Sequence, residues 1–194
     1  MVDIENSGRL KELLKALSED YANGKFTPIL EADVVGYLYY LWISKFDNAS
    51  KVHLNTRICG LVGKRRKFDF VAGDVKSGEL LKLSNEEFPC VDKPWLVIEV
   101  KSFLNGFKGS QLKKRYRYVE GDLRKLAKLG ETSNERYILF FDERNYLERI
   151  DKKRRSSRIN SIVELRNKLD SNIKIIHVKT KKEKDKKVLT WNFL

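Results

Sequence analysis

The sequence predicts an α/β fold in which helices flank a mixed β-sheet. Apolar residues recur at helical spacing near the N-terminus and again after residue 110, and short β-branched and aromatic runs lie between them. The run RYILFF at 136–141 is apolar throughout, as in a strand covered on both faces. The expected order is helix, three strands, helix, strand, helix, strand. Composition does not shift along the chain, so we expect a single domain over 1–194.

Two helices are expected within residues 8–46. The first, 8–22, carries leucines at helical spacing. The second follows Thr27 as N-cap and Pro28 as its first helical residue, and it is apolar nearly all round. At 100° per residue Glu31 falls among apolar side chains of this helix. Its carboxylate is therefore expected to point into the protein.

The middle of the chain predicts three strands and a helix. The runs 52–62 and 67–73 surround a basic turn, which is typical of a hairpin. Residues 74–94 contain glycine and proline without clear periodicity, so we expect mainly a loop there. PWLVIEVKSF then forms the next strand, and Ser110 caps the helix that follows. The C-terminal part, 156–194, is expected to hold a helix and strands.

The strand WLVIEVKSF carries two charges in an otherwise buried pattern. Because side chains on a strand alternate faces, Glu99 and Lys101 point the same way, about 7 Å apart. Asp69, in KFDFV, is a second polar residue inside an apolar strand. Two carboxylates with a backbone carbonyl and water are a ligand set suited to Mg²⁺. A lysine beside them can orient or deprotonate a water that attacks phosphorus.

These residues resemble the PD-(D/E)xK nuclease superfamily. The match consists of Phe68–Asp69, then IEVK at 98–101, within a stretch of about 28–141; phenylalanine replaces the proline of the family name. The resemblance implies a restriction-endonuclease-like fold with core order α-β-β-β-α-β and hydrolysis of phosphodiester bonds in DNA by an Mg²⁺-dependent endonuclease, with Mn²⁺ as a substitute. It implies the following site: Asp69, Glu99 and the Val100 carbonyl as metal ligands, Lys101 at the attacking water, and Glu31 in support.

Other interpretations of the same residues remain open. Asp69, Glu99 and Lys101 could form a buried ion-pair set, although such a set costs desolvation. Asp74 is an alternative first ligand, but its setting AGDVKSG is typical of a turn. The chain could also be a non-catalytic nucleic-acid-binding module or a subunit of a larger nuclease complex. An intact Glu99 and Lys101 favour catalysis over a decayed site.

Charge favours a polyanionic partner. Forty Lys and Arg against 27 Asp and Glu give a formal net charge of +13. The excess gathers in short runs, and for the runs interleaved with aromatic residues DNA is the expected partner. A solvated lysine-rich surface is the alternative, above all for the run at 179–187, which also contains Glu183 and Asp185. The side chains expected to contact phosphates are Arg65, Arg66, Lys113, Lys114, Arg115 and Arg117.

The remaining features predict where the protein works and how it assembles. The sequence has no apolar run long enough to span a membrane and no signal-peptide pattern, so a cytoplasmic protein is expected. Cys59 and Cys90 show no metal-binding spacing and are expected to be buried free thiols. Cutting both strands of a duplex would favour a homodimer.

Overall fold

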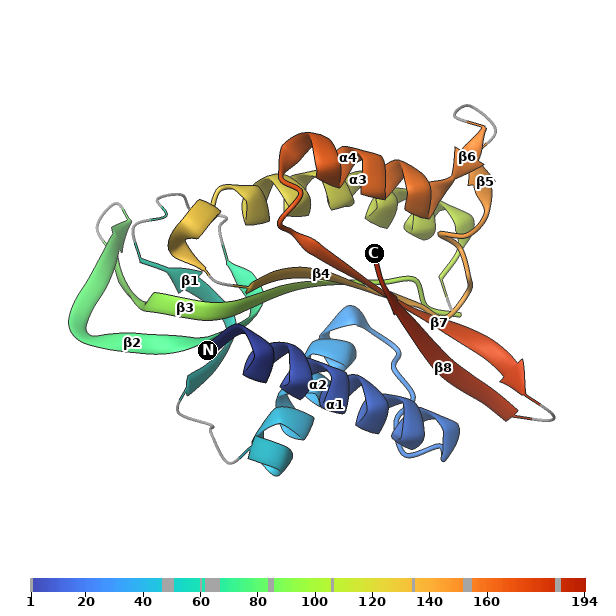
Figure 1. The fold of residues 1–194 in the computed structure, drawn as a ribbon, viewed down its shortest axis with the longest axis horizontal. Coiled ribbons are helices and arrows are strands. Elements are labelled where there is room, and N and C mark those ends of the chain that lie inside the picture. Colours follow the sequence, from blue (N-terminus) through green and yellow to red (C-terminus); the bar gives the residue numbers. More distant parts are fainter. Residues whose placement is uncertain are drawn as a thin grey trace.

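A computed structural model gives the fold of the protein (Figure 1). It describes residues 2–46, 51–59, 61, 67–83, 86–105, 107–133, 135–151, 155–183 and 186–194.

The centre of the molecule is a six-stranded mixed sheet with strand order β1-β2-β3-β4-β7-β8. The first three strands are antiparallel neighbours, β3, β4 and β7 run parallel, and β8 returns antiparallel to β7. The expected α/β architecture with a mixed sheet is therefore confirmed. The strands are β1 (Val52–Ile58), β2 (Phe68–Leu83), β3 (Glu86–Ser102), β4 (Glu135–Asp142), β7 (Lys174–Glu183) and β8 (Lys186–Phe193).

Helices cover both faces of this sheet, as Figure 1 shows: α1 and α2 lie on one side, and α3 and α4 on the other. None of the helices in the described part of the chain is long and apolar enough to cross a membrane. The helices are α1 (Val2–Ala22), α2 (Glu31–Phe46), α3 (Gly109–Ala127) and α4 (Arg158–Leu169), with a short 3₁₀ turn η2 (Gly130–Thr132) and a two-stranded ribbon of β5 (Ile150–Asp151) and β6 (Ser156–Ser157).

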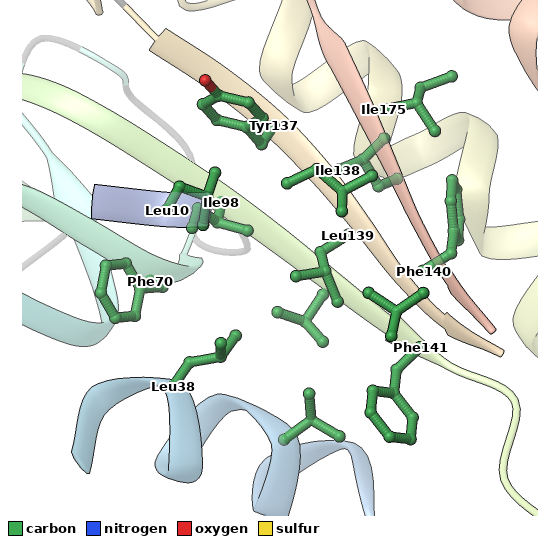
Figure 2. Close-up of a cluster of buried hydrophobic side chains, with 14 of the residues drawn as sticks. Leu10, Leu38, Phe70, Ile98, Tyr137, Ile138, Leu139, Phe140, Phe141 and Ile175 are labelled. Carbon is green, nitrogen blue, oxygen red and sulfur yellow. The ribbon is translucent and has the colours of Figure 1, made fainter. Parts of the chain in front are cut away.

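Strand β4 runs through the middle of the core, and all eight of its residues are buried. Figure 2 shows its side chains Tyr137 to Phe141 directed alternately to the two faces of the sheet, among residues of α1, α2, β2, β3 and β7. Removing this apolar surface from water is the main source of stability. The continuous apolar run in the sequence is explained by helices on both faces.

The segment expected to be a loop, 74–94, is instead part of a long hairpin. β2 and β3 pair antiparallel from Phe70–Ile98 out to Leu83–Glu86, with irregular register near Gly73. A Cβ on Gly73 would lie 2.6 Å from the Lys93 carbonyl oxygen, so only glycine allows the strands to approach there. The hairpin extends beyond the helices (Figure 1), where a strand needs no regular apolar alternation. Because this alternation is absent, the prediction of a loop over 74–94 was wrong.

Three helix starts also differ from expectation. α1 begins at Val2 rather than at residue 8. α2 begins at Glu31 rather than at Pro28, because the Asp33 carboxylate accepts hydrogen bonds from the backbone N–H groups of Ile29 and Leu30 in a turn before the helix. α3 begins at Gly109, and its N-cap is Lys108 rather than Ser110. Gln111 provides the capping contact by accepting from the Lys108 N–H at 2.6 Å.

The two cysteines form a disulfide, so the expectation of free thiols is wrong. Arg57 and Ile58 of β1 pair in parallel with Cys90 and Val91 of β3, which brings the Cα atoms of Cys59 and Cys90 to 5.2 Å. The cysteines are 31 residues apart in sequence. A disulfide needs Cα atoms within about 7 Å, and the pairing of β1 with β3, which are not consecutive strands, provides that distance.

Candidate functional site

The candidate site lies where the C-terminal end of β3 faces α3. Lys125 Nζ of α3 lies 2.5 Å from Glu99 Oε1, and one helical turn earlier Asp122 Oδ2 lies 3.0 Å from Lys101 Nζ. Residues two apart on a strand share a face, and residues three apart on a helix do too. The two elements therefore present matching pairs, and Glu99 and Lys101 point to the same side, as expected.

Glu99 is a buried carboxylate that is repelled by two other carboxylates and attracted by one lysine. Its side chain is 2% exposed. Burial, followed by the negative charge of Asp69, holds the pKa of Glu99 well above its usual range, and Asp122 adds to this, while Lys125 acts in the opposite direction. The positive charge of Lys125 therefore does not offset burial and the two negative charges, so the protein alone stabilises the ionised carboxylate poorly.

Lys101 has the opposite balance. Its side chain is 12% exposed, and burial by itself lowers its pKa. The charges of Asp122 and Glu31 outweigh burial, so the pKa of Lys101 is raised. The group is therefore held as an ammonium with carboxylates on two sides.

Glu31, the first residue of α2, reaches the same cluster. Its Oε2 accepts hydrogen bonds from the Ser102 N–H at 3.0 Å and from Arg115 Nη1 at 2.6 Å, and its Oε1 lies 3.5 Å from Lys101 Nζ. The expectation that this carboxylate points inward agrees with these contacts. It links α2 to the end of β3 and to the middle of α3.

Asp69 joins the cluster from β2. Its carboxylate Oδ2 accepts a hydrogen bond from the Val100 backbone N–H at 2.8 Å. This places it beside the backbone between Glu99 and Lys101. Phe68 and Phe70 on either side of Asp69 are fully buried, so the strand fixes its position firmly. The sequence-based set of Glu31, Asp69, Glu99 and Lys101 is thus gathered in one place.

Asp74 lies elsewhere. It belongs to strand β2 rather than to a turn, its side chain is largely exposed, and it pairs with Lys51. The hydrogen bond and the positive charge of Lys51 lower the pKa of Asp74. Its ion-pair partner is Lys51, whereas Asp69 contacts the backbone between Glu99 and Lys101, so Asp69 is the better first carboxylate.

The site also contains two residues that were not expected from the sequence, Asp122 and Lys125. The inner apolar stripe of α3 is Leu112, Val119, Leu123 and Leu126. Asp122 lies three residues after Val119 and four before Leu126, so it borders that stripe at helical spacing. A charged residue bordering an inner stripe is the signal that could have identified it.

The donor set is compatible with a divalent cation. The negative charge of Asp69 raises the pKa of Glu99, and a bound cation would relieve this repulsion. Within the described ranges, no three His, Cys, Asp or Glu side chains are arranged to bind a single ion. An ion at this place would therefore be held by the two carboxylates Asp69 and Glu99 with water completing its coordination, rather than enclosed by protein carboxylates.

A basic surface adjoins the cluster on α3. Lys113, Lys114 and Arg117 are exposed there. Arg115 is instead half-buried, bound to Glu31, with its guanidinium 4.4 Å from the Phe107 ring centroid. Arg65 and Arg66, the other two expected phosphate contacts, lie outside the described residues.

Comparison with known proteins gives little further guidance. No protein-family model matches the chain, and no curated protein matches it. Among solved structures, the chain is similar to Pyrococcus furiosus SfsA in complex with Ca²⁺, at 13% sequence identity and a TM-score of 0.36. That alignment covers 82% of this chain and 62% of the SfsA chain, so the chain spans less than two thirds of that structure. A likeness this weak assigns neither a family nor a function.

Proposed function

We propose that the protein is a metal-dependent endonuclease of the PD-(D/E)xK type that hydrolyses phosphodiester bonds in DNA. The observation that carries the proposal is the condition of Glu99: a buried carboxylate with a raised pKa, repelled by Asp69 and Asp122, and two residues from a lysine. Groups with a pKa perturbed in this way concentrate at functional sites, because the repulsion between carboxylates does not stabilise the fold. The element order α2-β1-β2-β3-α3-β4 is compatible with the core of that superfamily.

In this proposal Asp69, Glu99 and the Val100 carbonyl hold Mg²⁺ or Mn²⁺. A bound ion would supply Lewis-acid stabilisation of the charge that develops on the phosphate. Lys101, with its raised pKa, stays protonated; its role is to hold and orient the attacking water and to stabilise negative charge, rather than to remove a proton. Glu31 and Asp122 position the ammonium from two sides.

A second candidate is a non-catalytic DNA-binding protein. One observation favours it: charges alternate along the cluster, so that Lys125 meets Glu99, Asp122 meets Lys101, and Glu31 meets both Lys101 and Arg115. Such a ladder could join β3 to α2 and α3 without any metal. Asp69 and the raised pKa of Glu99 are what this alternative leaves unexplained.

Cleavage assays distinguish the two candidates. Labelled linear, branched and single-stranded DNAs are incubated with the protein and Mg²⁺ or Mn²⁺. We expect cleavage by the wild type, loss of at least about a hundredfold in rate for Glu99→Gln and Lys101→Met, and DNA affinity within about twofold of wild type for both. Glu120→Gln is the control, because Glu120 is an exposed carboxylate of α3 that pairs with Arg124 rather than with the cluster. DNA binding without cleavage of any substrate would favour the non-catalytic protein.

A further inference from the structure

Two adjoining hollows lead from the surface of α3 to the candidate site. The inner one, of about 350 Å³, reaches Lys101 and Glu31 and is walled by Phe107, Gln111 and Arg115. The outer one, of about 420 Å³, is lined by Ser110, Lys113 and Arg117. Lys114 and Tyr118 line both. The two hollows therefore adjoin at Lys114 and Tyr118, with cationic side chains beside both.

Tyr118 stands at the junction of the two hollows. Its side chain is 55% exposed, although a tyrosine ring buries a large apolar area when it has a partner. It lies one helical turn after Lys114 and one turn before Asp122 of the cluster. A flat aromatic face flanked by lysine and arginine is the arrangement on which unpaired bases stack while cations follow the phosphates.

The depth of the site limits what can reach it. Lys101, which lines the inner hollow, is 12% exposed, and Glu99, two residues before it on β3, is 2% exposed, so both groups lie below the surface. A hollow of a few hundred Å³ is the size of a small ligand pocket. One nucleotide on a flexible strand can enter such a space, whereas a base held in a duplex keeps its faces stacked and unavailable to Tyr118.

We propose that the site acts on single-stranded DNA, with one unpaired base stacked on Tyr118, phosphates at Lys113, Lys114 and Arg117, and the next phosphodiester directed into the inner hollow toward Lys101. This inference rests on the proposed nuclease function and specifies its substrate. A single strand needs one site per molecule, so a homodimer is not required for the reaction.

Fluorescence anisotropy tests this without any chemistry. Metal-free wild-type protein is titrated into a labelled single strand of about 15 nucleotides, within the usual site sizes for such proteins, and into a hairpin duplex of matched length. We expect tighter binding of the single strand. Tyr118→Ala should weaken it roughly tenfold or more and change duplex affinity less than about twofold, while Tyr118→Phe, which keeps the ring, should bind like wild type.

Tyr40→Ala is the matched control, because Tyr40 is 57% exposed on α2, away from both hollows. It should bind like wild type. Equal single-strand affinity for Tyr118→Ala and wild type, or tighter binding of the duplex by wild type, overturns the single-strand assignment while leaving the nuclease proposal intact. Failure of wild type to bind either DNA overturns the nuclease proposal itself.

Discussion

Two buried carboxylates on neighbouring strands, Asp142 of β4 and Glu99 of β3, show opposite ways of placing an acid inside this protein. Asp142 is 0% exposed and accepts hydrogen bonds from the backbone N–H groups of Tyr146 and Leu147, at 2.7 and 2.8 Å. The ring of His177 lies 3.2 Å from its second oxygen. These contacts close the turn after β4, so the carboxylate is fully used by the fold.

Glu99 is nearly as buried but much less well compensated. Lys125 is its ion-pair partner, and Asp69 and Asp122 repel it, so its pKa is raised. Two backbone N–H groups donate to Asp142, whereas Glu99 has a single ammonium, that of Lys125, which also donates to the Lys67 carbonyl oxygen. Burial alone therefore does not identify a functional acid. What identifies it is whether the groups around the acid repel its negative charge, as at Glu99, or stabilise it, as at Asp142.

The largest expected contrast between the two is in stability. Asp142→Asn leaves an amide NH₂ facing one of two backbone N–H donors, which should lower the free energy of unfolding by about 3 kcal/mol. Glu99→Gln removes a poorly compensated charge, so we expect no loss or a small gain. Urea unfolding without metal at neutral pH measures both. If the cluster is a structural ion-pair ladder, Glu99→Gln will also lose roughly 3 kcal/mol, because Lys125 is left without its charge partner.

The second contrast is the response to a divalent cation. An ion that binds the folded protein at a concentration of about 100 times its Kd stabilises it by about 2.7 kcal/mol. We expect Mg²⁺ or Mn²⁺ to raise the Tm of wild type and of Asp142→Asn, but not of Glu99→Gln or Asp69→Asn. An equal response of all four proteins would mean that the ion binds elsewhere.

The different roles of these two acids were only partly visible in the sequence. The polar interruption of an apolar strand marked Asp69, Glu99 and Lys101, because a strand with a period of two has few reasons to bury charge. Asp142 follows an apolar run and resembles any strand-ending turn residue. Its partner His177 lies on β7, 35 residues later, and their contact depends on the parallel pairing of β4 with β7.

The same limit explains the other errors. The Cys59–Cys90 disulfide and the pairing of Lys125 with Glu99 join segments whose contact is set by the assembled sheet and helix, not by local spacing. The β2–β3 hairpin was missed because the chain there lacks the alternation on which strand prediction relies. Local periodicity predicted the elements that pack on the core. Contacts between elements distant in sequence could be identified only from the three-dimensional structure.

The third contrast concerns pH. The raised pKa of Glu99 means that the folded protein binds its proton more tightly than the unfolded chain does. Stability of the metal-free wild type should therefore fall, relative to Glu99→Gln, as pH rises from the unfolded pKa of about 4.5 through the higher folded pKa, by about 1.4 kcal/mol for each pH unit within that interval. Unfolding curves of both proteins from pH 5 to 8 measure the difference. Parallel curves would show that Glu99 titrates normally.

The smallest expected effect is at Glu31, the acid that lies between the two extremes. Its Oε2 accepts from the Ser102 N–H and from Arg115, as a structural acid does, while its Oε1 faces Lys101 as a member of the cluster. A glutamine keeps one acceptor for the Ser102 N–H but turns an amide toward the Lys101 ammonium. We expect Glu31→Gln to slow cleavage roughly tenfold, equivalent to about 1.4 kcal/mol, and to change the free energy of unfolding by less than about 1 kcal/mol. Single-turnover cleavage and urea unfolding measure the two quantities, with Glu120→Gln as the control. An unchanged rate would place Glu31 with Asp142 as a structural acid, and the proposed site would then consist of Asp69, Glu99 and Lys101 with Asp122 beside them.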